Sequence, residues 1–472
     1  MGYTIQDSQH FKLQPRIIIH GGAGNIQREN YPPEKYQSYR DALITVITKT
    51  NAYMTTPAKR ASEKSPASSS AALLPSALDV ATFAVTLLED NPLFNSGHGA
   101  VFTRDGVNEL EASVMVSRGR DKRGVGVMGL RRVRNPIVLA RAMLEHGQDD
   151  LRPRRAGLDG PSEQDLDVPS AQGHTQLFGA AAEQLAAGYG LNLVDPGYFF
   201  TQQRWDEHQR ALGRERNSGT GAGATWSAEE YLPQGTCGAV ALDEDGVICV
   251  ATSTGGMTNK LTGRIGDTPV VGAGFWAEEW TEDGDPTGAS AGVWRRLREV
   301  VTGQGPSVVL GDALAGALAD CLPTPRMYTP LPAPWPGRAR TTRSMGGSGT
   351  GNGDSFLRIN ALRTVGAMAR WKPETSAAAV TRVAGPGGEL ELSAGDRWGR
   401  TGEGEGGIIG IECAVIHDAA GRVVDARSEI LMDYNCGGMF RAWIDDRGRP
   451  VMSIWTNGAS DDLGEQVTGG KR

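Results

Sequence analysis

Apolar and polar positions alternate along the chain with two periods, one typical of strands and one typical of helices. Short apolar runs on either side of a polar turn predict two hairpins, with strands at residues 237–242 and 247–252, and at 408–417 and 423–427. Apolar residues three or four positions apart predict four helices, at residues 36–53, 77–88, 136–144 and 175–189. Hairpins accompanied by amphipathic helices favour a layered, mixed α/β architecture in which one sheet packs on another.

Between these elements lie inserts of biased composition that we interpret as surface loops. Three of them are rich in Ala, Ser, Gly, Pro or charged residues, at 57–76, 147–172 and 213–224. A longer insert at about 278–344 has an acidic, Trp-rich start, an apolar stretch at 307–321 that predicts a helix, and a Pro-rich end. A further insert lies between Lys372 and Gly406.

Composition restricts the classes of protein that remain. A net charge of -7 gives no general attraction to nucleic acid, and no apolar run approaches the length of a membrane span. Residues 1–14 lack the apolar core of a signal peptide, and the five cysteines include no Cys-x-x-Cys pair. We therefore expect a cytoplasmic protein with neither a disulfide framework nor a zinc site, and with no nucleic-acid or membrane partner.

The candidate chemistry begins at Thr236, which follows Gly235 at the start of a predicted strand. A threonine hydroxyl becomes a useful nucleophile when the residue is the first of a chain, because its own α-amine then acts as the base. An internal threonine reaches that state only if the bond before it is cut, and glycine lets a hydroxyl approach its carbonyl closely. Gly-Thr is also an ordinary way to enter a strand, so the surrounding motifs decide the interpretation.

Five blocks, in order, accompany this junction. They are residues 17–24 (IIIHGGAG), 87–102 continued by 109–115, 251–274 (with GGMTNKLTGRIGDTP), 350–358 (TGNGDSFLR) and 435–441 (NCGGMFR). Together with Gly235 and Thr236 they resemble the plant-type (type 2) asparaginase and isoaspartyl peptidase family of N-terminal-nucleophile hydrolases. The resemblance covers about half of the chain.

This resemblance implies a four-layer αββα sandwich with long surface insertions and with Thr236 at the end of a central strand. It implies self-cleavage into an α chain, residues 1–235, and a β chain, residues 236–472. Two such αβ units would assemble as an (αβ)2 heterotetramer. The implied reaction is hydrolysis of β-aspartyl amides and isoaspartyl dipeptides through a β-aspartyl enzyme, with a small-molecule substrate and no cofactor.

The resemblance also assigns roles to individual residues. Thr236 is the nucleophile, Thr254 orients it, and Asn95 positions groups during cleavage. The Thr350 hydroxyl and the Gly351 N–H stabilise the oxyanion. Arg264 binds the substrate α-carboxylate and Asp267 its α-ammonium group. In some relatives a loop holds a structural sodium ion through backbone carbonyls, and the matching residues are Leu88, Glu89, Asn91, Phe94, Ser96 and His98. No catalytic metal is expected.

Some positions depart from the family pattern. Cys237, Asn352 and Asp354 replace residues that relatives commonly carry there, which are valine, threonine or another small residue, and glutamate. The insert at 278–344 separates two active-site segments, so it could reshape the mouth of the site and leaves the choice of substrate open.

Several alternatives stay open. A glycosylasparaginase or a threonine aspartase would share the fold and the nucleophile. A serine hydrolase is suggested by the Gly-x-Ser-x-Gly pattern around Ser290, although a polar turn precedes it where a buried strand is needed. Residues 402–407 formally fit a Gly-x-Gly-x-x-Gly dinucleotide loop, but their glutamates would repel phosphates. A catalytically silent binding protein that keeps the fold is the last alternative.

Overall fold

The computed structural model describes residues 13–57, 73–120, 123–151, 170–218, 235–283, 340–372 and 375–455. The chain divides into two compact units. The larger spans Met1–Glu279, Ser344–Cys413 and Ser428–Arg472, and the smaller spans Trp280–Arg343 and Ala414–Arg427. The residues assigned to the threonine-hydrolase site all lie in the larger unit.

An eight-stranded sheet carries the junction at Thr236. Its strand order is β12-β11-β1-β5-β6-β2-β3-β4, and its described pairings are antiparallel except for β3 with β4. The strands are β1 (Arg16–Gly24), β2 (Leu110–Val116), β3 (Gly124–Leu130), β4 (Gln176–Phe178), β5 (Cys237–Leu242), β6 (Ile248–Thr254), β11 (Gly438–Ile444) and β12 (Pro450–Ser453). Strands β2, β5 and β6 are buried along their whole length, which shows that both faces of the sheet are covered.

A second, four-stranded sheet has the order β10-β9-β8-β7. Its strands are β7 (Phe275–Asp283), β8 (Arg340–Gly351), β9 (Gly406–His417) and β10 (Val423–Tyr434). Small residues of β8 allow it to lie close to the first sheet. A Cβ atom on Gly346 would lie 2.5 Å from the Ile248 side chain, and Ser348 is 2.7 Å from His20 of β1.

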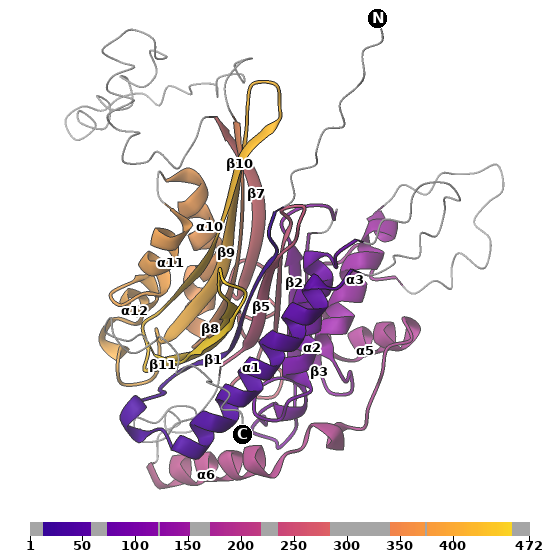
Figure 1. Ribbon diagram of the computed structural model, residues 1–472. Coiled ribbons are helices and arrows are strands. Elements are labelled where there is room, and N and C mark those ends of the chain that lie inside the picture. Colours follow the sequence, from indigo (N-terminus) through magenta and orange to yellow (C-terminus); the bar gives the residue numbers. More distant parts are fainter. Residues whose placement is uncertain are drawn as a thin grey trace, which may run out of the picture. The chain divides into compact units, whose positions relative to one another are not determined.

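Helices flank both sheets (Figure 1). Those that contact the first sheet include α1 (Pro33–Thr55), α2 (Ala77–Glu89), α3 (Pro136–Leu151) and α5 (Gly179–Gly188), and the chain then continues to α6 (Gln202–Ser218). The later helices are α9 (Gly353–Ile359), α10 (Ala361–Trp371), α11 (Ser376–Ala384) and α12 (Glu389–Ala394). Single 3-10 turns are η1 (Arg28–Asn30), η2 (Gly97–Gly99), η3 (Pro196–Phe199) and η6 (Gly395–Arg397).

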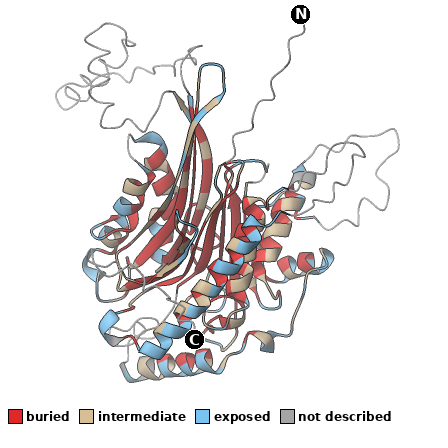
Figure 2. Ribbon diagram, viewed as in Figure 1, coloured by how far each residue is buried: buried red, intermediate tan, exposed pale blue. Residues whose placement is uncertain are grey.

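Local sequence explains where α2 starts and which face it buries. Ser76 and Asp79 form a reciprocal capping box, in which each side chain accepts a hydrogen bond from the backbone of the other residue. Apolar residues follow, and Ala81, Val85 and Leu88 are fully buried against the sheet. Figure 2 shows the general pattern, with buried residues on the strands and on the helix faces turned toward them.

Most of the predicted elements are confirmed. Both hairpins form, and the helices predicted at 36–53, 77–88 and 136–144 lie within α1, α2 and α3. The helix predicted at 175–189 is wrong at its start, because Gln176–Phe178 pairs with β3 as β4. Gly179 then takes a positive φ of 58°, a conformation that separates the strand from the helix.

The inserts need correction. The interval between Lys372 and Gly406 is not a surface insert, because it forms α11 and α12 and buries Val380, Val383 and Leu390. The long insert is narrower than predicted, since β7 continues to Asp283 and β8 starts at Arg340. The insert at 147–172 starts later, after α3, and the one at 213–224 overlaps α6, which continues to Ser218. The helix predicted at 307–321 lies outside the described residues.

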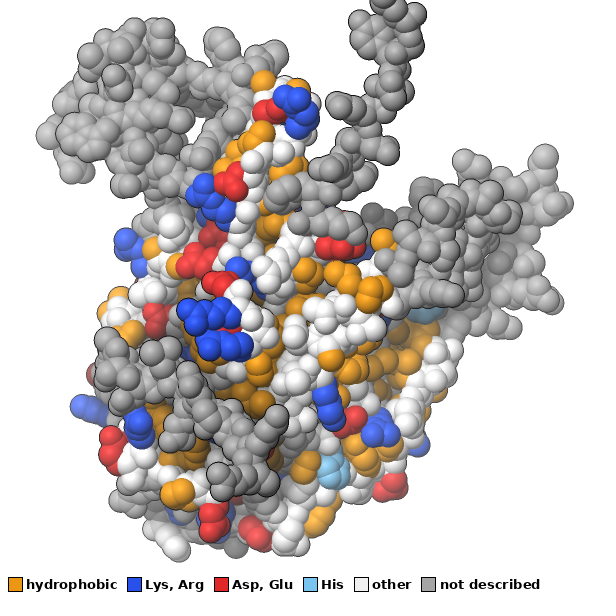
Figure 3. Space-filling view, viewed as in Figure 1, with side chains coloured by type: hydrophobic (Ala, Val, Ile, Leu, Met, Phe, Trp, Pro, Cys, Tyr) orange, Lys and Arg blue, Asp and Glu red, His pale blue; other side chains and the backbone are white. Residues whose placement is uncertain are grey.

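Other broad expectations concern membranes, metals and charge. Within the described ranges, no helix combines the length and apolar character needed to cross a membrane, and no three His, Cys, Asp or Glu side chains gather as metal ligands. Cys237, Cys249, Cys413 and Cys436 are free thiols. Acidic and basic side chains are interspersed on the described surface visible in Figure 3, rather than separated into large areas of one sign.

Candidate active site

Gly235 and Thr236 lie directly before β5, at the centre of the larger sheet. The site is crowded: a Cβ atom on Gly235 would lie 2.1 Å from the Gly22 Cα atom and 2.6 Å from Thr350 Oγ1. Gly22, near the end of β1, has a positive φ of 124°, which favours glycine there as well. Only glycine therefore fits before Thr236, and the Thr350 hydroxyl lies beside that glycine.

The hydroxyl of Thr236 contacts Thr268, to which no motif assigned a role. Thr236 is 6% exposed, and its Oγ1 lies 2.9 Å from Oγ1 of Thr268, which is itself buried. Thr268 directly follows the predicted site residue Asp267, and this position is the signal in the sequence that could have placed it at the site. Thr254, at the end of β6, accepts a hydrogen bond from the Gly256 N–H at 3.0 Å, and its role in orienting the nucleophile stays a prediction.

Thr350 and Gly351 end strand β8. Thr350 Oγ1 is buried and has no hydrogen-bond partner among the described residues. Gly351 has a φ of 141°, and a Cβ atom there would lie 2.4 Å from the carbonyl oxygen of Glu405. Since an unsatisfied buried hydroxyl costs about 1–3 kcal/mol, its presence beside Gly235 is most easily explained by a ligand oxygen or a reacting carbonyl that it serves.

Asn95 joins the loop after α2 to the end of β6. Its side-chain amide donates to the Gly256 carbonyl at 2.7 Å, and its side-chain oxygen accepts from the Val101 N–H at 3.0 Å. Its backbone carbonyl also accepts from Gly255 N–H at 3.1 Å. Asn95 therefore fixes the turn that follows Thr254, which is consistent with a positioning role.

Arg264 and Asp267 lie close together beside α9. A Cβ atom on Gly353 would lie 2.6 Å from Asp267 Oδ1 and 3.1 Å from Arg264 Nη2. Arg264 pairs with the exposed Asp354 at 2.9 Å, whereas Asp267 Oδ2 has no partner among the described residues. Burial raises the pKa of Asp267 to about 7, although Arg264 opposes the shift. A cation and an incompletely satisfied anion therefore stand side by side.

A neutral histidine lies next to the junction and was missed by the sequence reasoning. His20 of β1 is paired with Gly238 of β5, and its Nε2 lies 2.7 Å from Ser348 Oγ. Burial lowers the pKa of His20 to about 3, with the backbone of Thr236 partly opposing the shift. Burial also raises the pKa of the Cys237 thiol to about 12, so this neighbour does not compete as a thiolate.

The backbone carbonyls of the predicted sodium loop already take part in hydrogen bonds. The carbonyls of Asn91, Phe94 and Ser96 each accept one backbone N–H, whereas the Leu88 carbonyl accepts two, from Asp90 and Asn91. One lone pair is therefore left on each of the first three oxygens and none on the Leu88 oxygen. Burial raises the pKa of the Glu89 carboxyl to about 8, so that side chain adds little negative charge near neutrality. The backbone oxygens are compatible with a weakly bound cation, and the sodium site stays a prediction.

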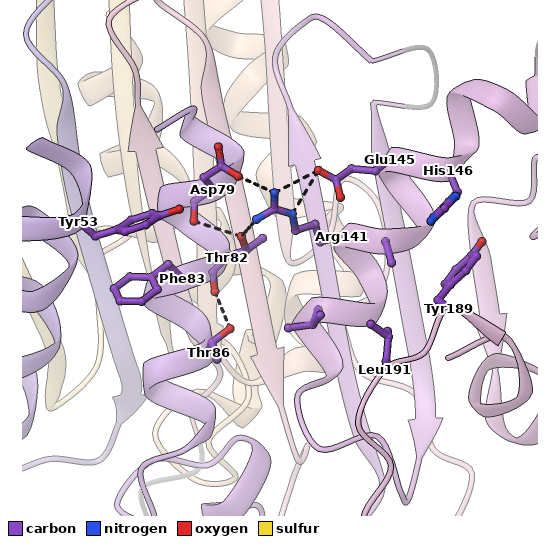
Figure 4. A pocket seen from close by; sticks show the side chains of 12 residues that line it. Tyr53, Asp79, Thr82, Phe83, Thr86, Arg141, Glu145, His146, Tyr189 and Leu191 are labelled. Carbon is purple, nitrogen blue, oxygen red and sulfur yellow. Dashed lines mark hydrogen bonds and ion pairs between the residues drawn. The ribbon is translucent and has the colours of Figure 1, made fainter. Parts of the chain in front are cut away.

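A pocket of about 520 Å³ lies elsewhere, between the helices that cover the larger sheet (Figure 4). None of the candidate site residues lines it. Its charged groups satisfy one another, because Arg141 pairs with both Asp79 and Glu145. The predicted chemistry therefore belongs to the junction at Thr236 and not to this pocket.

Comparison with known proteins identifies the family. A family model described as Asparaginase matches residues 13–151 and 167–289. An isoaspartyl peptidase of Escherichia coli is 38% identical over 261 residues, which cover 55% of this chain and 67% of that protein. A plant-type L-asparaginase of Pyrococcus furiosus is 33% identical over 270 residues, which cover 56% of this chain and 70% of that protein. The chain belongs to the plant-type asparaginase and isoaspartyl peptidase family, and it is a hydrolase.

The structure bears on one of the other motifs in the sequence, the formal dinucleotide loop. Residues 402–407 follow the turn η6 and lead into strand β9, so they lack the strand before and the helix after that a dinucleotide loop requires. Ser290, the candidate of the serine-hydrolase alternative, lies outside the described residues.

Proposed function

We propose that this enzyme is a self-processed threonine amidohydrolase that cleaves β-aspartyl amides and isoaspartyl dipeptides. The observation that carries the proposal is the junction itself: Gly235 packs where no side chain fits, beside the Thr350 hydroxyl, which has no partner among the described residues, and the buried Thr236 directly precedes the central strand β5. The names of the relatives, isoaspartyl peptidase and plant-type L-asparaginase, support the same reaction class.

The proposal includes the organisation of the chain. Residues 1–235 and 236–472 become the α and β chains of one four-layer αββα fold, and two αβ units assemble as (αβ)2. The close approach of β8 to the larger sheet, the helices that contact the larger sheet, and the Phe356 and Leu362 side chains of α9 and α10 beside β8 support the layered arrangement. We retain a cytoplasmic location and a small-molecule substrate as parts of the proposal.

Maturation is the first reaction. The Thr236 hydroxyl attacks the Gly235 carbonyl, and the Thr350 hydroxyl, which lies beside Gly235, donates to the developing oxyanion. The C–N bond between the two residues breaks, an ester replaces it, and the α-amine of Thr236 is set free. Water then hydrolyses the ester and leaves Gly235 with a carboxylate. Thr268, hydrogen-bonded to Thr236 Oγ1, helps to hold the nucleophile in place.

Turnover uses the same hydroxyl. Thr236 Oγ1 attacks the side-chain carbonyl of the substrate while the free α-amine accepts the proton and passes it to the leaving amine. The Thr350 hydroxyl and the Gly351 N–H stabilise the oxyanion. Water cleaves the β-aspartyl ester and releases aspartate.

Arg264 and Asp267 form what we name the aspartyl clamp. The planar guanidinium of Arg264 suits the α-carboxylate, and Asp267 suits the α-ammonium group. Asp267 Oδ2 has no partner among the described residues, so it can accept a hydrogen bond from the substrate. Arg264 pairs with the solvent-exposed Asp354, and the substrate carboxylate can replace that partner.

The pKa of Asp267 gives the clamp a pH dependence. Because that pKa is about 7, the carboxyl loses its charge as the pH falls below neutrality and no longer attracts an ammonium group. The inhibition constant of L-aspartate should rise roughly tenfold for each pH unit below 7. Measured inhibition between pH 5 and 8 checks this, with Asp267→Asn expected to bind weakly at every pH. A constant affinity for wild type over that range would contradict the assignment.

Gly353 lies so close to Arg264 and Asp267 that a side chain there would contact both. Gly353→Ala would put a methyl group 2.6 Å from Asp267 Oδ1, so KM should rise roughly tenfold or more while the cleaved fraction stays high. Steady-state kinetics and gel analysis measure both quantities. Gly213→Ala on α6 is the matched control, because a Cβ atom there meets no atom within 4 Å. Equal kinetics for the two variants would rule out the predicted contact.

The direct test of substrate class compares a β-aspartyl dipeptide, L-asparagine and a glycosylasparagine. The proposal expects the first two to be hydrolysed with higher kcat/KM than the third. A clear preference for the glycosylated compound would move the enzyme to the glycosylasparaginases. Cleavage of proteins after aspartate would indicate a threonine aspartase, and absence of both self-cleavage and hydrolysis would indicate a silent binding protein.

A further inference from the structure

Two glutamates hold the clamp loop, which we define as residues 261–268: Glu109, directly before β2, and Glu111 within it. Glu109 Oε2 accepts a hydrogen bond from the Gly263 N–H at 2.7 Å. Glu111 accepts from the Gly266 N–H, with its two carboxylate oxygens 3.2 and 3.3 Å from that nitrogen. The two carboxylates therefore fix the backbone on both sides of Arg264.

Lys260, just before this loop, completes the arrangement. Its Nζ donates to the Glu109 carbonyl at 3.1 Å and lies 3.5 Å from Glu111 Oε1. The Lys260 and Glu111 side chains are only 2% and 1% exposed, so they form a buried ion pair. Burial lowers the pKa of Lys260, and Glu111 opposes that shift. Since an unpaired buried charge is strongly unfavourable, each group requires the other.

The pair is also close enough to influence the charges of the clamp. A Cβ atom on Gly266 would lie 2.9 Å from Arg264 Nη1 and 3.3 Å from Glu111 Oε2, so the carboxylate and the guanidinium approach the same point. Burial raises the pKa of Asp267 most; among its charged neighbours, Arg264 lowers that pKa, whereas Glu111 and Asp354 raise it. Lys260 enters this set as the ion-pair partner of Glu111.

We propose that Glu111 and Lys260 are positioning residues of the aspartyl clamp: Glu111 fixes the Gly266 backbone behind Arg264, and Lys260 cancels the Glu111 charge so that Asp267 can bind an ammonium group as an anion. This inference rests on the proposed function, because it concerns how that same site recognises the α-carboxylate and α-ammonium of an aspartyl group. Neither residue touches the reacting carbonyl.

Variants of Lys260 and Glu111, alone and combined, test whether these residues position the clamp or only stabilise the fold. Lys260→Met leaves the Glu111 charge uncompensated, so the pH midpoint of L-aspartate inhibition should rise by at least about half a unit, with KM increased roughly threefold or more at pH 7 and kcat changed less. Glu111→Gln keeps an oxygen acceptor for Gly266 but removes the charge, so the midpoint should fall. In Glu111→Gln/Lys260→Met both charges are absent, and the midpoint should return to or below the wild-type value.

The matched control is Glu278→Gln, which disrupts another buried ion pair. Glu278 is 2% exposed on β7 and pairs with Arg363 and Arg370 at 3.1 and 3.0 Å, without contact to the clamp. It should lower thermal stability and leave the pH midpoint unchanged. If the Lys260 and Glu111 variants behave like this control, the inference is overturned. If wild type neither hydrolyses a β-aspartyl dipeptide nor binds L-aspartate, the proposed function fails instead.

Discussion

Thr236→Ala is expected to abolish both self-cleavage and hydrolysis, with kcat lowered by roughly 10⁴-fold or more. The substitution removes the hydroxyl that attacks in both reactions, and without cleavage the α-amine stays locked in a peptide bond. Gel analysis and hydrolysis of a β-aspartyl dipeptide measure the two effects. The fold should persist, because the side chain that is removed is small and the flanking strand β5 keeps its pairing with β1 and β6.

Thr236→Ser provides the control for this prediction. Serine keeps the hydroxyl and the α-amine, so this variant should still cleave itself and retain measurable turnover, even if more slowly. A Thr236→Ala protein that hydrolyses substrate at a rate near that of wild type would show that another group is the nucleophile. If Ser290→Ala were inactive in that case, the serine-hydrolase alternative would be favoured.

Thr350→Val is expected to lower kcat by about 10²–10³-fold with little change in KM. Valine has nearly the shape of threonine, so the buried site stays filled while the hydroxyl beside Gly235, which lacks a partner in the described part of the chain, disappears. A donor that acts on the oxyanion contributes mainly in the transition state, and its loss therefore appears in kcat. Self-cleavage should slow as well, and incubation followed by mass spectrometry measures that rate.

A matched threonine tests whether the effect is specific. Thr50 is buried in α1, and its hydroxyl bonds to the Val46 carbonyl of the same helix. Thr50→Val should leave kcat and cleavage close to wild type. If Thr350→Val is as active as Thr50→Val, the Thr350 hydroxyl is not the oxyanion donor, and the assignment based on its missing partner is incorrect.

Local patterns in the sequence were enough to predict the hairpins β5–β6 and β9–β10 and the cores of α1, α2 and α3. Elements that depend on distant partners were predicted less well. The segment Gln176–Phe178 is a strand only because β3 lies beside it, and α11 and α12 belong to the core because their apolar faces are covered by other elements. The region of α11 and α12 resembled a surface insert because only its composition was considered.

The same distinction applies to the site. Thr236, Thr350, Arg264 and Asp267 carry motif signals and could be assigned roles by resemblance. Thr268, His20 and the Glu111–Lys260 pair contribute through contacts between segments far apart in sequence. A single sequence records those residues but not which of them touch, so their roles required the structure.

The intact mass of the purified enzyme, with N-terminal sequencing of its fragments, shows whether the chain cuts itself before Thr236. We expect two fragments separated between Gly235 and Thr236, the second beginning with Thr-Cys-Gly, and a single uncut chain for Thr236→Ala. A wild-type protein that stays uncut after prolonged incubation, yet hydrolyses β-aspartyl dipeptides, would contradict the account, because catalysis would then proceed without a free threonine amine.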